Sequence, residues 1–139
     1  MVAFPLYEDR QIAALESQAH AILGTFAARG YRRQEPSILQ PADIFLERSG
    51  EEIRRRTFTL TDPAGNELCL RPDLTIPICR EHVAHGAGLP ARICYNGLAF
   101  RHQPSEPHRP TQFYQAGAEL LGVADRQAQF AAKRADLVA

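Results

Sequence analysis

The stretch that decides the fold is residues 92–121, RICYNGLAFRHQPSEPHRPTQFYQAGAELL. It contains two runs rich in β-branched and aromatic residues, 92–100 and 112–121, and such runs are typical of strands. The loop between them is polar and contains three prolines, so neither strand continues through it. The sequence therefore predicts a long hairpin at the centre of the fold.

One face of the second strand has the pattern of a binding site. Side chains alternate along a strand, so every second residue from 113 to 119 shares that face. These residues are Phe113, Gln115, Gly117 and Glu119. A glycine between an amide and a carboxylate is expected to leave room above the sheet for a ligand. The residues expected to pack in the core on the other face are Tyr114, Ala116, Ala118 and Leu120.

The first strand supplies a cation to the same predicted site. Gly97, Ala99 and Arg101 alternate there, so two small residues lead to a charge. The guanidinium of Arg101 offers a planar fork of donors for a carboxylate or phosphate. Glu119 would accept from an ammonium group or an imidazole N–H, and Gln115 would supply a neutral partner.

Residues 71–75 add a further carboxylate and a hydroxyl, from Asp73 and Thr75, where a predicted strand turns into a helix. With Arg101, these groups could recognise both ends of an α-amino acid. Two alternatives remain open from the sequence. Arg101 and Glu119 could form only a salt bridge, and Asp73 could be only a helix cap.

The histidines predict neither a metal site nor a catalytic base. His82 and His85 have a spacing that metal ligands can use on a helix, but no third ligand is evident, which favours a partly exposed structural pair. His102 and His108 lie in the polar loop, where solvent or a ligand phosphate would surround them. We expect neither a metal nor a cofactor.

Periodicity and turn residues predict the remaining elements. In chain order they are a helix at 8–29, an edge strand at 31–39, a helical turn at 41–46, a hairpin of 57–61 with 67–71, a helix at 74–85 and a last helix from about 125. The order of these elements indicates an α+β fold, an antiparallel sheet flanked by helices, in preference to a βαβ fold.

Composition indicates one domain, residues 1–139, outside the membrane. Lys plus Arg equals Asp plus Glu at 16 each, which argues against a general nucleic-acid-binding surface. The three cysteines, Cys69, Cys79 and Cys94, cannot all pair within the chain and are expected to pack as small apolar residues in a reducing cytoplasm. Neither a signal peptide nor a membrane span is predicted, so a cytoplasmic location is expected.

Several motifs resemble those of class II aminoacyl-tRNA synthetases. Residues 30–36 resemble motif 1, in which a long helix leads into a strand that ends near a proline. Residues 100–103 and 112–122 resemble motif 2 as histidyl-tRNA synthetases have it. Leu-Arg-Pro-Asp-Leu-Thr at 70–75 is similar to the synthetase pattern Leu-Arg-Pro-Glu-Gly-Thr. The resemblance implies part of a class II catalytic core.

The chain is still more similar to the synthetase-like regulatory subunits of ATP phosphoribosyltransferase. That similarity lies in residues 38–43, 70–77 and 84–86 and extends over nearly the whole chain. By resemblance, Arg101, Gln115 and Glu119 match positions that contact ATP or histidine in the synthetases, and Arg109 matches an arginine of the motif 2 loop. Homodimerisation is implied as well, because motif 1 builds the dimer interface in class II folds.

The differences from the synthetase pattern concern catalysis. Gln103 stands where motif 2 normally has a glutamate that contacts adenine, and Thr111 stands where histidyl enzymes have a second arginine. Motif 3, which supplies an arginine for ATP, is not found before Ala139. The resemblance therefore implies a domain that is incomplete at its C-terminus, or completed by a partner, and that does not activate an amino acid by itself.

The resemblance therefore implies a non-catalytic regulatory subunit of ATP phosphoribosyltransferase in histidine biosynthesis. Its implied partner is the short catalytic subunit, with histidine as feedback ligand and a homodimer within a hetero-oligomer as the assembly. One alternative is the N-terminal part of a histidyl-tRNA synthetase, which would activate histidine with ATP. The other is a small dimeric scaffold without a ligand.

Overall fold

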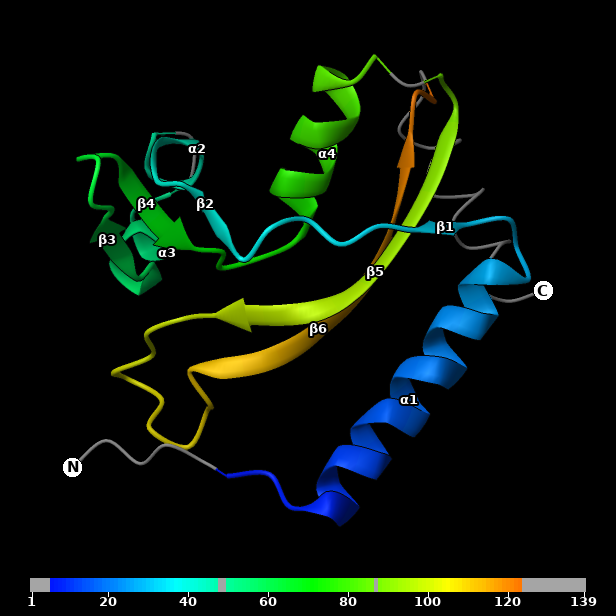
Figure 1. The fold of residues 1–139 in the computed structure, drawn as a ribbon, viewed down its shortest axis with the longest axis horizontal. Helices are drawn as coiled ribbons and strands as arrows, with labels where there is room; N and C mark the ends of the chain where they lie inside the picture. The colour runs from blue at the N-terminus through cyan, green and yellow to red at the C-terminus, as the bar shows by residue number, and fades with distance from the viewer. Residues whose placement is uncertain (1–5, 48–49, 87, 124–139) are drawn as a thin grey trace.

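The structure, a computed structural model, describes residues 6–47, 50–86 and 88–123. Its centre is the antiparallel pair β5 (Ala91–Phe100) and β6 (Gln112–Leu121), whose ten residues pair without interruption. Figure 1 shows these strands as one long curved ribbon with a helix on either side. The hairpin predicted from residues 92–121 is confirmed, and so is the α+β class.

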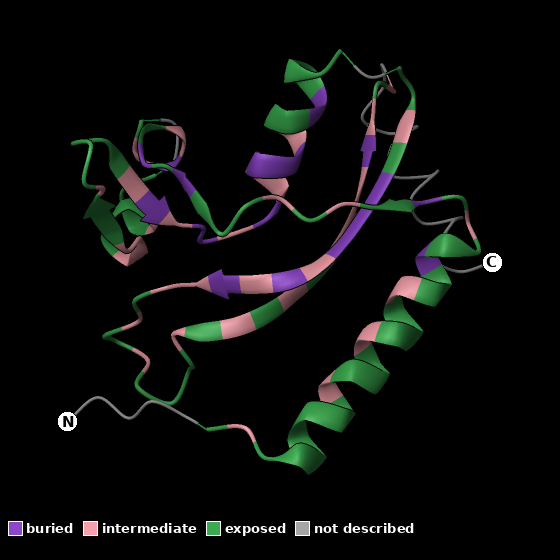
Figure 2. Cartoon of the chain, in the orientation of Figure 1, coloured by how far each residue is buried: buried purple, intermediate pink, exposed green. Residues whose placement is uncertain are grey.

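Two helices cover opposite faces of this ribbon. Helix α1 (Asp9–Ala27) brings Phe26 against Cys94 and Ala118. On the other face, Leu74 and Ile78 at the start of α4 (Thr75–Ala84) pack on Ile93, Tyr95 and Ala99. In Figure 2 the buried residues gather along β5 and the first turns of α4. The predicted helices 8–29 and 74–85 are confirmed.

A second, smaller sheet has the order β2-β4-β3 and lies beside the ribbon. Strands β3 (Thr59–Thr61) and β4 (Glu67–Leu70) form the predicted hairpin, closed by Asp62, whose Oδ1 accepts from the backbone N–H groups of Ala64 and Asn66. Helix α2 (Asp43–Leu46) is the predicted helical turn. Ala42, Phe45 and Cys69 form a small buried cluster under this sheet.

The single edge strand predicted at 31–39 is wrong, because the structure divides this segment between the two sheets. Strand β1 (Arg32–Arg33) pairs with β5, and in parallel, so the main sheet is mixed. The N–H of Gln34 still donates to Cys94 O, but Pro36 has no N–H with which to continue the ladder. The chain then leaves the ribbon and forms β2 (Leu39–Pro41) against β4.

Helix α3 (Glu51–Arg56) was not predicted. Its acidic residues lie in the first turn and its basic residues in the last, which suits the helix dipole. Two i,i+4 ion pairs, Glu51 with Arg55 and Glu52 with Arg56, support it. An amphipathic pattern is missing because only Ile53 among its six residues is apolar, so periodicity could not reveal it.

The prediction that Tyr114, Ala116, Ala118 and Leu120 form a continuous core face is only half right. Leu120 is buried and Ala118 packs in the Phe26 cluster, but Tyr114 is 49% exposed and Ala116 is exposed too. The last helix, predicted from about residue 125, lies outside the described residues. Within the described ranges, no helix is long and apolar enough to cross a membrane.

Candidate functional site

The side chains predicted to bind a ligand converge on one turn, residues 72–75, that leads into α4. Arg101 Nε donates to Pro72 O at 2.8 Å. Gln115 Oε1 accepts from the N–H of Leu74 at 3.0 Å. Thr75 Oγ1 donates to Glu119 Oε1 at 3.1 Å. Residues up to 44 positions apart in the chain therefore meet at one helix N-terminus.

Tyr95, which the sequence did not single out, completes the group around Glu119. Its hydroxyl lies 3.0 Å from Thr75 Oγ1 and donates to Glu119 Oε1 at 3.3 Å. Tyr95 is opposite Gly117 in the register, and a Cβ at Gly117 would come within 2.4 Å of the Tyr95 hydroxyl oxygen. The expectation that Gly117 leaves room for a ligand is thus wrong: the glycine makes room for Tyr95.

The environment of Tyr95 keeps its hydroxyl protonated. Burial raises the pKa of Tyr95, and the nearby Glu119 carboxylate raises it further, while the hydrogen bond with Thr75 acts in the opposite direction. The two hydroxyls have two protons for three contacts, so at most two of these contacts are hydrogen bonds at one time. A carboxylate can accept roughly four hydrogen bonds, so the contacts with Thr75 and Tyr95 do not by themselves exclude a ligand N–H at Glu119.

Arg101 is held at its stem with the end of its fork available. Nε bonds to Pro72 O, and the guanidinium carbon lies 5.3 Å from the centroid of the Phe113 ring, a cation–π distance. Among the described residues, the two terminal nitrogens of Arg101 have no hydrogen-bond or ion-pair partner. Arg101 bonds Pro72, whereas Glu119 bonds Thr75 and Tyr95. Arg101 and Glu119 therefore do not form the salt bridge that the alternative interpretation expected.

Asp73 acts as a helix cap, as the alternative interpretation expected. Its Oδ1 accepts from the N–H of Ile76 at 3.2 Å, in the first turn of α4. It also lines a cavity of about 190 Å³ together with Arg101, Pro72 and three residues of α3, which are Glu52, Ile53 and Arg56. Capping and ligand contact are compatible, because a carboxylate has a second oxygen.

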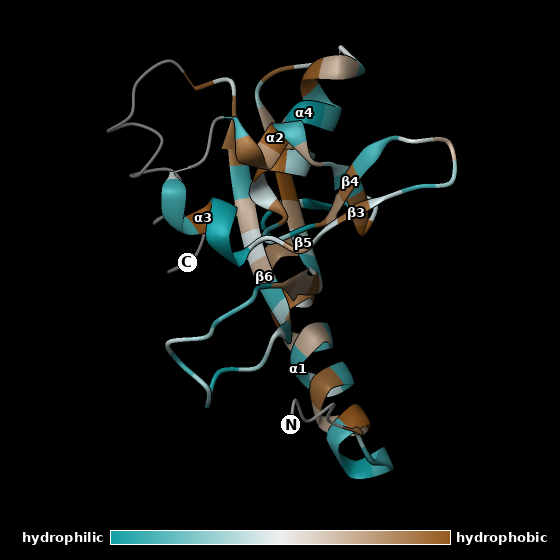
Figure 3. Cartoon of the chain, turned by 90° about the vertical axis from the view of Figure 1, so that its left-hand side faces the viewer, coloured by the Kyte–Doolittle hydropathy of each residue, from teal (hydrophilic) through white to brown (hydrophobic). Residues whose placement is uncertain are grey.

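Gln103 and Arg109, the two nucleotide-binding-like residues, lie away from this turn in the loop between β5 and β6. Gln103 Nε2 donates to Pro110 O at 3.1 Å, and Arg109 forms an ion pair with Glu106. Figure 3 shows this loop as mainly hydrophilic. Both side chains are thus bonded within the loop, and the structure does not bring them to Glu119.

The four histidines of interest have different surroundings. His102 makes an edge-on contact with the Phe58 ring at 5.9 Å, and His108 is exposed. His85 is exposed and its Nδ1 lies 2.8 Å from Glu81 O, whereas His82 is buried, so the prediction of a partly exposed pair holds only for His85. No set of three or more His, Cys, Asp or Glu residues in the described ranges is arranged for a metal ion.

Sequence reasoning missed two parts of the site, Tyr95 and helix α3, and only Tyr95 had a usable signal. The alternation Gly97, Ala99, Arg101 extends two residues back to Tyr95, so Tyr95 could have been placed on the same face. Arg56, from the unpredicted α3, carried only the acidic-then-basic pattern of its helix. Arg56 and Asp73 line the same cavity only because tertiary contacts bring α3 beside the turn at 72–75.

The arrangement of a hairpin, a motif 1-like helix and the turn at 72–75 defines a class II aminoacyl-tRNA synthetase-like core, and solved structures share it. A regulatory subunit of ATP phosphoribosyltransferase/histidyl-tRNA synthetase from Bacillus halodurans superposes with a TM-score of 0.78 at 24% identity, covering 96% of this chain and 35% of that one. Apo histidyl-tRNA synthetase from S. aureus superposes with a TM-score of 0.74 at 20% identity, covering 99% of this chain and 33% of that one.

The chain belongs to the histidyl-tRNA synthetase family, whose sequence profile matches residues 7–134. Two curated relatives, both called ATP phosphoribosyltransferase regulatory subunit, are each 44% identical. The protein from Allorhizobium ampelinum aligns over 75% of this chain and 27% of its own length, and that from Chelativorans sp. over 86% and 31%. The chain therefore spans under a third of the length of these relatives. The resemblance identified from the motifs is confirmed.

Proposed function

We propose that the protein acts as a regulatory subunit of ATP phosphoribosyltransferase in histidine biosynthesis. It binds the short catalytic subunit, makes that subunit active and transmits histidine feedback to it. The relatives at 44% identity, which carry the regulatory-subunit name, support this assignment. The observation that carries the ligand assignment is that Arg101 and the cluster of Glu119, Thr75 and Tyr95 meet the same turn at 72–75.

The chemistry of the turn at 72–75 suits free histidine. The Arg101 fork binds the α-carboxylate, and Glu119 accepts from the ammonium or the imidazole N–H. Arg101 bonds Pro72 and Glu119 bonds Thr75. Pro72 and Thr75 are three residues apart, so at most about 11 Å of chain separates the two contacts. The cavity beside Arg101, about 190 Å³, is smaller than the roughly 300 Å³ at which sites for drug-sized ligands begin. That size favours an amino acid over a nucleotide.

The residues at the motif 2 positions support a loss of adenylation chemistry. Gln103 replaces a carboxylate with an amide, and the amide nitrogen is bonded to Pro110 O. Arg109, the loop arginine that would approach a triphosphate, is paired with Glu106. These bonds support a binding role over catalysis.

The partnership is tested by mixing the protein with the short catalytic subunit. A complex on size-exclusion chromatography, a higher turnover and a new inhibition by histidine are expected. The absence of both a complex and a rate change would contradict the proposal.

Histidine binding is tested by thermal unfolding. A ligand that binds only the native state raises the melting temperature, so histidine should raise it for the wild type. Glu119→Ala should abolish that rise, and Glu67→Ala, which removes an exposed carboxylate on β4, should retain it. An unchanged rise in Glu119→Ala would place the ligand elsewhere.

A second candidate function is the histidine-activating part of a histidyl-tRNA synthetase, which the matching family profile favours. The assay is histidine-dependent exchange of pyrophosphate into ATP by the full-length gene product. Exchange would support the synthetase, and its absence would exclude that alternative.

We also propose that the protein forms a homodimer within the hetero-oligomer and resides in the cytoplasm. Helix α1 leaves Ile12 and Ile22 exposed by 42% and 40%, which supports contact with a second copy. The three cysteines form no disulfide, which is consistent with a reducing compartment. Light scattering of the wild type and of Ile22→Lys tests the dimer: a monomeric wild type would contradict it.

A further inference from the structure

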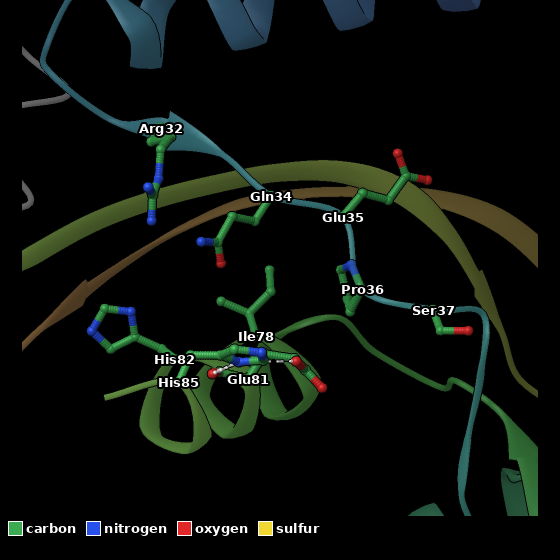
Figure 4. A pocket seen from close by; sticks show the side chains of 9 residues that line it. All are labelled: Arg32, Gln34, Glu35, Pro36, Ser37, Ile78, Glu81, His82 and His85. Atoms are coloured by element: carbon green, nitrogen blue, oxygen red, sulfur yellow. Dashed lines mark hydrogen bonds and ion pairs between the residues drawn. The ribbon is translucent and has the colours of Figure 1, made fainter. Parts of the chain in front are cut away.

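A separate cavity of about 530 Å³ lies between the segment that follows β1 and the C-terminal half of α4. Figure 4 shows Arg32 and Gln34 reaching from the strand side towards the helix, with the His82 ring on the helix side. Ile78, Glu81 and His85 of α4 complete the helix wall. This volume lies within the roughly 300–1,000 Å³ of small-molecule sites.

His82 is the feature of this cavity that the fold leaves unexplained. The residue is only 5% exposed, and within the described part of the chain neither of its ring nitrogens has a hydrogen-bond partner. A neutral imidazole has one N–H donor and one acceptor, and burying such groups unpaired is costly. Buried polar side chains almost always have partners. A bound molecule that meets the ring would supply one.

The charges around the cavity determine which kind of molecule fits. Arg32 is exposed and has no ion-pair partner among the described residues, so its guanidinium is available. The carboxylate of Glu35 instead lies 3.5 Å from Arg33 and 3.8 Å from Arg71. The carboxylate of Glu81 lies 3.5 Å from His85 Nδ1. Three groups of the lining can therefore donate to a ligand: the Arg32 guanidinium, the Gln34 amide NH₂ and the N–H of the His82 ring.

We propose that this cavity is a second ligand site, which binds a small molecule through a carboxylate or phosphate group. The Arg32 guanidinium holds the oxyanion, and the Gln34 amide and the His82 ring donate to it. The site is distinct from the turn at 72–75, because His82 is seven residues beyond Thr75, about 10 Å along the helix axis. It is a binding site, and no reaction is assigned to it.

The test uses the purified protein and two probes, inorganic phosphate and citrate, followed by NMR of the His82 imidazole signals. Saturable shifts are expected with at least one probe, and the responding probe distinguishes a phosphate from a carboxylate ligand. Arg32→Gln should weaken binding about tenfold or more, since hydrogen bonds to charged groups are strong. Arg54→Gln is the matched control, with the same charge change on an exposed residue outside the cavity.

His82→Leu should remove binding while leaving α4 intact by circular dichroism. If that variant does not fold, Arg32→Gln still decides, because Arg32 is exposed. The proposal is overturned if the His82 signals do not saturate with either probe. It is equally overturned if Arg32→Gln and Arg54→Gln weaken binding alike, since that result means unspecific attraction of anions.

Discussion

Tyr95 and Gly117 face each other across the central hairpin, and the Tyr95 ring occupies the space that any side chain at position 117 would need. This relationship aims the Tyr95 hydroxyl at Thr75 and Glu119. The glycine thus positions a hydroxyl of the candidate site.

Gly117→Ala is expected to lower the free energy of unfolding by about 1–3 kcal/mol, the usual cost of overpacking. The added methyl would meet the Tyr95 ring within 3 Å, and this ring is buried under α4. Urea denaturation measures the change. Gly24→Ala in α1, where nothing lies within 4 Å, is the control and should stabilise by about 0.5–1 kcal/mol. Equal stability of Gly117→Ala and the wild type would contradict the packing described.

Arg71→Lys is expected to destabilise the fold by about 2 kcal/mol or more. Arg71 is fully buried and donates to Leu98 O and Pro36 O, so it connects the ribbon to the β1–β2 segment. Burial lowers the pKa of Arg71, and the nearby Glu35 counteracts this. A lysine keeps the charge but lacks the planar fork. Chemical denaturation measures the free energy of unfolding. For the exposed control Arg55→Lys it should stay within about 0.5 kcal/mol of the wild-type value, as is usual for surface substitutions.

Arg101→Lys is expected to weaken histidine binding about tenfold with little loss of stability. The lysine retains a positive charge but cannot hold Pro72 O and a carboxylate with one planar group. Calorimetric titration with histidine measures the affinity. Arg54→Lys, on the exposed side of α3, should bind as the wild type does. If Arg101→Lys also binds normally, the carboxylate does not contact Arg101.

Stability is expected to fall in alkaline solution through Cys69. Burial, with a smaller contribution from Asp43, raises the pKa of this thiol from 9.0 to about 11. The pKa of Cys69 is higher in the folded than in the unfolded state. The contribution of this thiol to the free energy of unfolding is therefore fully present below about pH 9 and is lost as pH rises towards 11. Denaturation at several pH values across this interval should show that the free energy of unfolding falls less steeply for Cys69→Ala than for the wild type.

The sequence by itself determined the elements whose patterns are local. The period of two at 92–100 and 112–121 predicts β5 and β6, and the period of 3.6 predicts α1 and α4, because each pattern records which side of one element is buried. It also brought Arg101, Gln115 and Glu119 onto one face, since alternation needs no knowledge of other elements.

Only the tertiary structure decided what covers each face. Glycine at 117 could serve a ligand or a neighbour, and the register with Tyr95 decides for the neighbour. Likewise, Gln115 and Glu119 meet the turn at 72–75 because α4 packs on their side of the ribbon. A pattern along one segment shows that a side is covered, but the covering residues lie tens of positions away, and long-range packing alone brings them together.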